Sequence, residues 1–460
     1  MSLLRDFEQK DAAVLGEELH RFARELYPIC RSITGDGLRK TLALIQKRIP
    51  LQTVEVPSRT QVFDWNVPWE WNIRDAFVKS ADGKRVVDFQ QCNLHVMNYS
   101  APVRATMPLS ELKAHLFTMP EKPDWIPYRT SYYKEDWGFC LSHNQMLALQ
   151  DGEYEVCIDS TLQAGSMTLG ECYLPGRTAE EVLISCHACH PSLADDNLSG
   201  LTVAAHLAQF LAGRDLRYSY RFLFIPGTIG AITWLAQNQA AAERIRHGLV
   251  LTCIGDRGSF HYKKTRRGKA AIDRAMMHVL THLTNSPEFL EFSPYGYDER
   301  QYCSPGFNLP VGCLMRSVWG TFPEYHTSAD DLEFIHPEQL AESLRVCISV
   351  VDVLESNRSY RNLNPHCEPH LGKRGLYRPT GGGSIEEEVN AQLWVLNLSD
   401  GEHSLLDIAE RSHIAFPTVS DAADRLCKSG LLTAISEESS PVNSAQEGSA
   451  PIAVVRRSHS

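Results

Sequence analysis

Residues 181–200, EVLISCHACHPSLADDNLSG, contain side chains that could bind a metal ion. An apolar run predicted to be a buried strand ends at His187, and a loop then presents Asp195 and Asp196 just before a predicted helix. Imidazole and carboxylate groups are ligands that Zn²⁺ selects, and a loop lets them converge on one ion. Alternatively, His187 and His190 are ordinary loop histidines and Asp196 caps the helix.

Two more candidates occupy similar places further along the chain. Asp256 follows the apolar run GLVLTCIG, and His326 lies in the polar loop PEYHTSADDLEFI before another predicted helix. Taken singly, Asp256 could be a turn residue and His326 a surface histidine. Ligands gather at the carboxyl ends of strands in open α/β sheets, so the joint pattern favours a metal site. The predicted metal ligands are His187, Asp196, Asp256 and His326, with His190 and Cys189 as alternates.

The elements around these residues alternate between strand and helix from about residue 165 to 365. This alternation predicts an α/β fold with a parallel sheet covered by helices on both faces. Two further helical patterns fall between about residues 10 and 48. We therefore expect one discontinuous domain that comprises residues 1–60 and 161–370.

Three other regions differ in composition from this domain. Residues 61–160 contain five of the eight tryptophans and short alternating runs, which predicts an inserted β-rich domain. A Gly-rich linker is expected at 371–384, followed by a winged-helix domain at 385–435 with three short helices and a terminal strand pair. The polar residues 436–460 are predicted to be a disordered tail.

The motifs together resemble those of a known superfamily. His187 after a strand, DNLSG at 196–200, Asp256 after another strand and YHT at 325–327 resemble the di-zinc aminopeptidase and glutamate carboxypeptidase superfamily. The resemblance implies the fold of a zinc exopeptidase, a phosphorylase/hydrolase-like mixed sheet flanked by helices. The segments CHPSLADDNLSG, DERQYCSPGF and PEYHTSADDL are similar, more narrowly, to bacterial aminopeptidase-like proteins linked to polysaccharide biosynthesis, which carry a β insert and a terminal winged helix.

The resemblance also implies roles for these residues. The sequence departs from the superfamily pattern at two other positions. In the superfamily, the residues matching His187 and Asp256 hold one zinc, the one matching His326 helps to hold a second, and the one matching Asp196 bridges both. Two glutamates, a general base and a zinc ligand, would follow the strand RFLFIP, but Gly227 and Thr228 stand there. We therefore expect one zinc ion rather than two.

Hydrolysis would then need another proton acceptor. The candidate catalytic residues are Asp195, Glu299 and Glu324, and the sequence does not choose among them; Glu299 and Glu324 could equally be ion-pair partners in loops. Arg300 could bind a substrate carboxylate, because a guanidinium binds such groups with two hydrogen bonds. Arg300 could also be a structural ion-pair partner, and Tyr325 is the second candidate substrate-binding residue.

Composition limits the partners and the location of the protein. The formal charge of −11 over 460 residues argues against a broad nucleic-acid-binding or membrane-binding surface. No apolar run approaches the length of a membrane-spanning helix and no secretory signal is evident, so a cytoplasmic protein with reduced cysteines is expected. The candidate recognition helix, about 417–428, balances acidic against basic residues, which makes DNA binding unlikely.

Three functions remain open. The first is a zinc-dependent aminopeptidase-like hydrolase of a small peptide or amide, with a link to polysaccharide biosynthesis. The second is a metal-binding relative without turnover that serves as a ligand-binding or interaction protein. The third is a DNA-binding regulator. Protein partners or self-association through the winged helix and the β insert are also expected.

Overall fold

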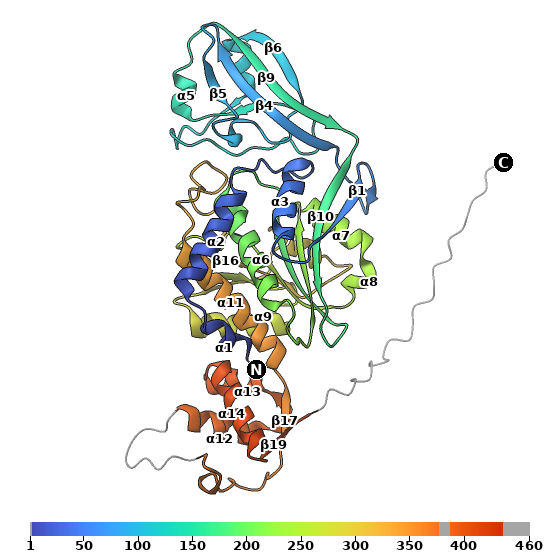
Figure 1. Ribbon diagram of the computed structural model, residues 1–460, viewed down its shortest axis with the longest axis vertical. Coiled ribbons are helices and arrows are strands. Elements are labelled where there is room, and N and C mark those ends of the chain that lie inside the picture. Colours follow the sequence, from blue (N-terminus) through green and yellow to red (C-terminus); the bar gives the residue numbers. More distant parts are fainter. Residues whose placement is uncertain (1, 377–386, 436–460) are drawn as a thin grey trace, which may run out of the picture. The chain divides into compact units, whose positions relative to one another are not determined.

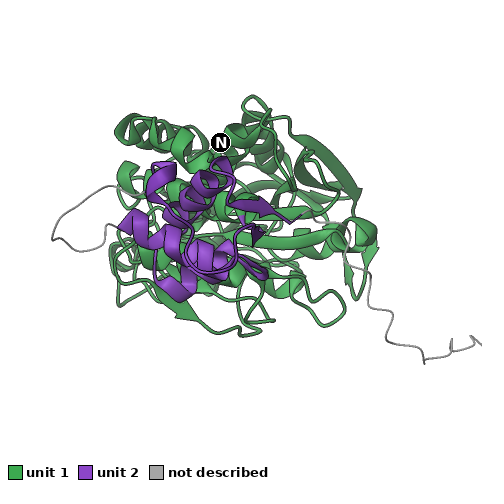
Figure 2. Cartoon of the chain, turned by 90° about the horizontal axis from the view of Figure 1, so that it is seen from below, with its two compact units in different colours: residues 1–356 green, residues 357–460 purple. Residues whose placement is uncertain are grey.

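The computed structural model describes residues 2–376 and 387–435. The chain divides into two compact units, residues 1–356 and 357–460, which Figure 2 colours separately. Most of the predicted linker (377–384) and all of the predicted tail (436–460) lie outside the described residues.

A mixed eight-stranded sheet forms the centre of the first unit (Figure 1). Four strands in the middle, β12, β11, β13 and β16, run parallel, and the strands at both edges introduce antiparallel pairs. In the order of the sheet the strands are β1 (Gln52–Pro57), β10 (Ser166–Leu174), β12 (Ser219–Ile225), β11 (Glu181–His187), β13 (Ile245–Leu251), β16 (Val311–Met315), β14 (His261–Lys263) and β15 (Glu288–Leu290).

Strands β11, β12 and β16 are buried along their whole length because helices cover both faces of the sheet. On one face α11 packs against α1, α2, α6 and α9. On the other face α7 shares a core with alternate residues of the strands, including Leu183 and Leu223. The helices of this unit are α1 (Leu3–Glu8), α2 (Ala12–Leu26), α3 (Asp36–Gln46), α4 (Leu109–Leu112), α5 (His143–Leu147), α6 (Gly200–Leu211), α7 (Ile229–Gln237), α8 (Gln239–Ala242), α9 (Ala271–Leu283), α10 (Glu299–Tyr302) and α11 (Pro337–Ser356). The predicted α/β fold is confirmed.

The insert forms a separate sheet within the same unit (Figure 1). Its four antiparallel strands lie in the order β5 (Arg85–Asp88), β4 (Glu70–Ser80), β9 (Glu153–Gln163) and β6 (Val103–Pro108). Smaller pairs join β2 (Gln61–Val62) to β3 (Trp65–Asn66) and β7 (Leu116–Phe117) to β8 (Phe139–Cys140). Val78, Val156 and Ile158 belong to a core of the insert's own. The predicted β character of this region is therefore observed, and β9 ends three residues beyond the predicted boundary at 160.

The second unit combines three helices with a three-stranded sheet. The helices are α12 (Glu387–Leu398), α13 (Leu405–Ser412) and α14 (Phe416–Lys428), and the strand order is β18 (Asp400–Ser404), β17 (Ser359–Asn362) and β19 (Leu432–Ala434). We predicted that the first domain extends to residue 370. The structure ends it at residue 356 instead, because β17 pairs with β18 and β19 in the winged-helix sheet.

Two further observations concern the state of the cysteines and the search for membrane-spanning helices. The thirteen cysteines are all among the described residues, and none of them forms a disulfide. Among residues 2–376 and 387–435, no helix combines the length and the apolar character needed to cross a membrane.

Candidate metal centre

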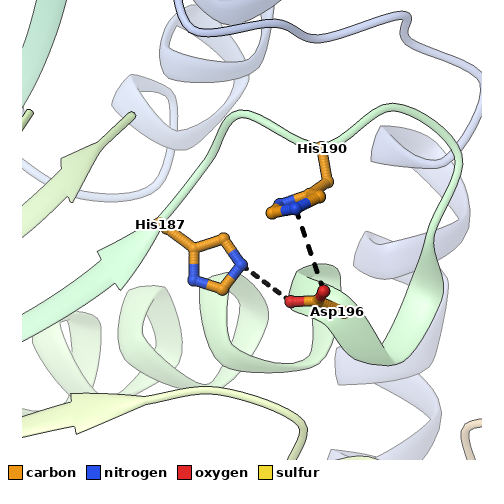
Figure 3. Close-up of side chains that lie close together, drawn as sticks. All are labelled: His187, His190 and Asp196. Atoms are coloured by element: carbon orange, nitrogen blue, oxygen red, sulfur yellow. Dashed lines mark hydrogen bonds and ion pairs between the residues drawn. The ribbon is translucent and has the colours of Figure 1, made fainter. Parts of the chain in front are cut away.

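Asp196 is the centre of a cluster of imidazoles at the carboxyl end of β11. The strand ends at His187, and a π-helical turn, η3 (Ala194–Ser199), then brings Asp196 back beside it (Figure 3). His187 Nε2 lies 2.8 Å from Asp196 Oδ1, and both side chains are fully buried. Burial alone would raise the pKa of Asp196, but the imidazoles of His190 and His187 outweigh it and hold the pKa well below its usual range.

His326 reaches the other oxygen of the same carboxylate. Its Nε2 atom lies 3.0 Å from Asp196 Oδ2. The inserted domain holds the loop that carries it, since the amide of Tyr128 donates to the His326 carbonyl at 2.8 Å and Pro127 forms a β-bridge with Thr327. The ring of Tyr128 also meets the rings of His190 and His326 edge to face, with centroids 5.1 and 5.0 Å away. The insert therefore helps to build the site.

Two tyrosines complete the surroundings of Asp196. The hydroxyl of Tyr297 donates to Asp196 Oδ2 at 2.8 Å, and its ring stacks on His187 with centroids 4.5 Å apart. Tyr325, predicted to bind substrate, shares a 2.7 Å hydrogen bond with the Tyr297 hydroxyl and stacks on His326. Tyr325 therefore lies at the site.

His190 also belongs to the cluster, and Cys189 Sγ lies 3.7 Å from His190 Nδ1. The nearest ligand atoms of His187, His190 and Asp196 all lie within 4.8 Å of one another. The guanidinium of Arg31 donates to the His190 carbonyl at 2.7 Å and so fixes the loop. Burial lowers the pKa of His190 to about 3. Cys189 Sγ also accepts from the amide of Gly227 at 3.2 Å, and burial raises the pKa of its thiol to about 12.

Asp256 was predicted to bind the metal, and the structure does not bring it to Asp196. Strand β13 ends at Leu251 and the chain turns at Cys253 (φ 50°), so Asp256 lies well beyond the edge of the sheet. Its carboxylate accepts from the Ser317 hydroxyl at 2.9 Å and the Ser317 amide at 3.2 Å. The apolar run GLVLTCIG resembles one continuous strand in sequence, and its last four residues are not part of the sheet.

Asp195, a candidate catalytic residue, faces the interior with other acids. Its Oδ1 atom accepts from the amide of Gly255 at 2.7 Å. Burial, and then the neighbouring Asp256 and Asp330, raise the pKa of Asp195 well above its usual range. Asp330 accepts hydrogen bonds from the amides of Asp195 (2.6 Å) and Asp196 (3.0 Å), which fixes the turn that presents Asp196. Asp195 is thus turned away from the imidazoles.

The remaining candidate catalytic and substrate-binding residues are Glu299, Glu324 and Arg300, and their surroundings differ from one another. Glu299 is fully buried and forms an ion pair with Lys263 at 2.8 Å, so it is a structural partner there. Glu324 is half-buried in the loop that carries His326. Arg300 lies on α10 and its Nε atom is buried without a hydrogen-bond partner among the described residues. The roles of Glu324 and Arg300 stay predictions.

Asp298, which directly precedes α10, places beside the turn after β12 a carboxylate that the sequence analysis overlooked. Thr228 takes a left-handed backbone conformation (φ 65°), and its amide donates to Asp298 Oδ1 at 2.6 Å. The second oxygen of Asp298 is buried without a hydrogen-bond partner among the described residues. Burial raises the pKa of Asp298 to about 6, although the nearby His187 imidazole opposes this. Asp298 therefore lies beside the place where Gly227 and Thr228 replace the expected glutamates.

Sequence reasoning also missed Tyr128, Tyr297, Asp298 and Asp330. Tyr297 and Asp298 directly precede or begin the segment DERQYCSPGF, and Asp330 lies in PEYHTSADDL. Both segments were used for the resemblance, so these three residues were within reach. Tyr128 had no comparable signal, because only the tertiary contact between the insert and the His326 loop brings it to the site.

The donor set fits a zinc ion. Two imidazole nitrogens that point at the two oxygens of one buried carboxylate provide the ligand types that zinc prefers, and a third imidazole lies close by. A tyrosine hydroxyl donates to the carboxylate, as groups around metal ligands commonly do.

Comparisons with known proteins agree with this architecture. A curated protein of Clostridium acetobutylicum, described as a polysaccharide biosynthesis protein with an aminopeptidase-like domain, is 51% identical over 424 residues, which span 92% of this chain and 98% of the relative. A crystal structure of a candidate peptidase from the same organism has a TM-score of 0.89 and 48% identity, and it covers 94% of this chain and 100% of its own.

More distant structures share the fold. A zinc aminopeptidase from Bacillus subtilis has a TM-score of 0.53 at 14% identity, over 74% of this chain and 94% of its own. A winged helix-turn-helix family model matches residues 358–434, which agrees with the unit that begins at residue 357. Residues 20–357 match the family model described as a domain of unknown function, DUF4910, and the protein therefore belongs to that aminopeptidase-like family.

Proposed function

We propose that the protein is a zinc-dependent, aminopeptidase-like hydrolase that cleaves an amide bond in a small peptide or amide substrate. The observation that carries the proposal is the approach of His187 Nε2 and His326 Nε2 to the two oxygens of the buried Asp196 carboxylate. His187, His190 and Asp196, whose ligand atoms lie within 4.8 Å of one another, would hold one zinc ion together with His326. An ion there would supply Lewis-acid activation of the scissile carbonyl.

Asp298 is our candidate for the proton acceptor. It lies beside the Gly227–Thr228 turn, and its free oxygen is buried near His187. A carboxylate whose pKa is raised toward neutrality can accept a proton and later return it to the leaving amine. Tyr297 and Tyr325 would orient Asp196 and border the substrate. Glu324 is the alternative acceptor, because it shares the loop of His326.

Metal analysis tests the site directly. Protein purified without chelator should contain close to stoichiometric zinc by mass spectrometry, and His187→Ala and His326→Ala should each lose most of it. His403→Ala is the matched control, since His403 contacts Asp400 at 2.8 Å in an exposed pair of the second unit. Equal zinc in the wild type and both site variants would refute the metal centre.

Hydrolysis of amino-acid p-nitroanilides and dipeptides tests turnover. Asp298→Asn should lower kcat by roughly 10²- to 10⁴-fold while zinc content stays unchanged, as expected when a general base is lost. Glu324→Gln should then change kcat little; the reverse result would assign the base to Glu324. A zinc-loaded wild type that hydrolyses none of a broad amide panel would favour the non-catalytic binding protein.

The name of the Clostridium acetobutylicum relative supports a further part of the proposal, a role in polysaccharide biosynthesis. For the second unit we propose contact with protein rather than with DNA. On α14, Asp421 and Asp424 offset Arg425 and Lys428, and Arg425 forms an ion pair with Glu388. A helix without excess positive charge gains little from phosphate contacts. Salt-dependent binding to duplex DNA would contradict this assignment.

A further inference from the structure

A pocket separate from the Asp196 cluster lies in the first unit. Its volume is about 790 Å³, within the usual size range of small-molecule sites. Residues of the segment 59–69, which contains β2 and β3, form one wall, and residues 133–135 of the insert form another. Tyr99 and Leu162 complete the lining.

Aromatic side chains in this pocket are exposed to solvent. Trp65 is 42% exposed, Trp69 39% and Tyr133 52%, although large aromatic side chains usually lie in the core. The rings of Trp65 and Tyr133 meet edge to face with centroids 5.3 Å apart. Exposed rings gathered in one hollow usually mark a binding surface.

Polar side chains with free hydrogen-bonding groups surround these rings. Asp64, Asn66 and Glu135 line the pocket, and no side-chain hydrogen bond or ion pair involves them among the described residues. Arg59 lies over the ring of Trp69, with 5.6 Å between the guanidinium carbon and the ring centroid. An apolar ligand would leave these donors and acceptors unpaired, which is costly in a pocket.

The backbone around the pocket is strained. Arg59, Tyr99 and Tyr133 have φ values of 69°, 71° and 65°, a region that residues other than glycine rarely occupy. These are three of the eleven such residues other than glycine in the described chain, and all three line this one pocket. Strained conformations concentrate at ligand-binding sites, where the surrounding structure holds them in place.

A chain of tyrosines connects the pocket to the candidate metal centre. Tyr133 is the neighbour of Tyr132, whose hydroxyl hydrogen-bonds to the Tyr128 hydroxyl at 3.0 Å. The Tyr128 ring in turn contacts His190 and His326. These contacts place the pocket and the Asp196 cluster at opposite ends of one packed group of tyrosines.

We propose that this pocket binds a saccharide, a binding site that does not depend on the proposed function. A pyranose ring has an apolar face of C–H groups that stacks on an aromatic ring and a rim of hydroxyls that pairs with carboxylates, amides and guanidinium groups. Trp65, Trp69 and Tyr133 supply the rings, and Arg59, Asp64 and Glu135 supply the polar partners.

Calorimetric titration of the full chain tests the pocket. The probes are mono- to tetrasaccharides of hexoses, N-acetylhexosamines and uronic acids, with trileucine amide as an apolar peptide probe. We expect at least one saccharide to bind, and Trp65→Ala and Trp69→Ala each to weaken that binding at least 10-fold, as the loss of a stacked ring predicts. Trp65→Phe should retain most of the affinity, which separates stacking from misfolding.

Two controls make the outcome decisive. Tyr173→Ala removes an aromatic ring of similar exposure, 40%, that lies on β10 outside the pocket lining, and it should leave saccharide binding unchanged. His187→Ala should abolish zinc binding and leave saccharide binding intact, so the pocket and the metal centre can fail separately. No binding by any saccharide, binding that survives both tryptophan substitutions, or Trp65-dependent binding of trileucine amide alone would overturn the proposal.

Discussion

Asp195 and Asp196 are neighbours in the chain and both are fully buried, yet their surroundings are opposite. Asp196 faces three imidazoles and a tyrosine hydroxyl, and its pKa is held well below the usual range. Asp195 faces Asp256 and Asp330, and its pKa is raised well above that range. Both side chains are buried, so the partners on each side of one turn decide in which direction the pKa of each identical side chain shifts.

Removing the charge of Asp196 should have the largest effect. In Asp196→Asn, zinc affinity should fall by more than the roughly 10- to 100-fold that changes around metal ligands cost, because both His187 and His326 approach this carboxylate. Competition with a chromophoric chelator measures the change. Wild-type zinc affinity in Asp196→Asn would contradict the proposed contrast between Asp195 and Asp196.

Asp330 accepts hydrogen bonds from the amides of both Asp195 and Asp196, so its loss should weaken zinc binding indirectly. Asp330→Ala leaves the amides of Asp195 and Asp196 without an acceptor, and we expect zinc affinity to fall roughly 10- to 100-fold. Asp331→Ala is the matched control, since Asp331 also accepts two backbone hydrogen bonds, from Glu333 and Phe334, and makes none with the turn. Similar losses of affinity in both variants would show a general effect on folding.

His247 provides a contrast to the imidazoles beside Asp196, because the charged side chains that act on this buried imidazole are basic. Burial, followed by the charges of Arg217 and Arg246, lowers its pKa to about 4. The unfolded chain takes up a proton near pH 6.5, whereas the native state resists until about pH 4, so stability should decrease as the pH falls through this window.

Urea unfolding between pH 7 and pH 4 measures this effect. His247→Phe, which keeps a ring against Tyr218, should reduce the acid destabilisation by about 3 kcal/mol. An unchanged pH dependence in His247→Phe would place the acid sensitivity elsewhere in the molecule.

The smallest effect is expected on the acidic side of the turn. Asp195→Asn keeps an oxygen for the Gly255 amide and removes the repulsion with Asp256, so the free energy of unfolding should stay within about 1 kcal/mol of the wild type or increase. Zinc content should not change. A loss of zinc comparable to that of Asp196→Asn would show that the two neighbours are not functionally distinct.

Sequence reasoning placed His187, Asp196 and His326 correctly at one site because each stands where an apolar run or a marked motif ends. It placed Asp256 at the same site, whereas in the structure β13 ends at Leu251 and the chain turns at Cys253 (φ 50°) before reaching Asp256. The α/β alternation and the β-rich insert were also readable from residue patterns. The contribution of Tyr128 could not be read from residue patterns. It depends on a contact between Tyr128 and His326, which are 198 residues apart in the sequence.

Strand β17 has a practical consequence for dividing the molecule. It lies in the middle of the second unit's sheet, between β18 and β19. In the sequence, however, β17 ends more than twenty residues before α12, the first α-helix of that unit. A chain shortened after residue 370 would retain β17 and lose both of its neighbours, which leaves two unpaired strand edges open to aggregation. A cut after Ser356 avoids this, and a transplanted winged-helix unit must start no later than Asn357 to keep its central strand.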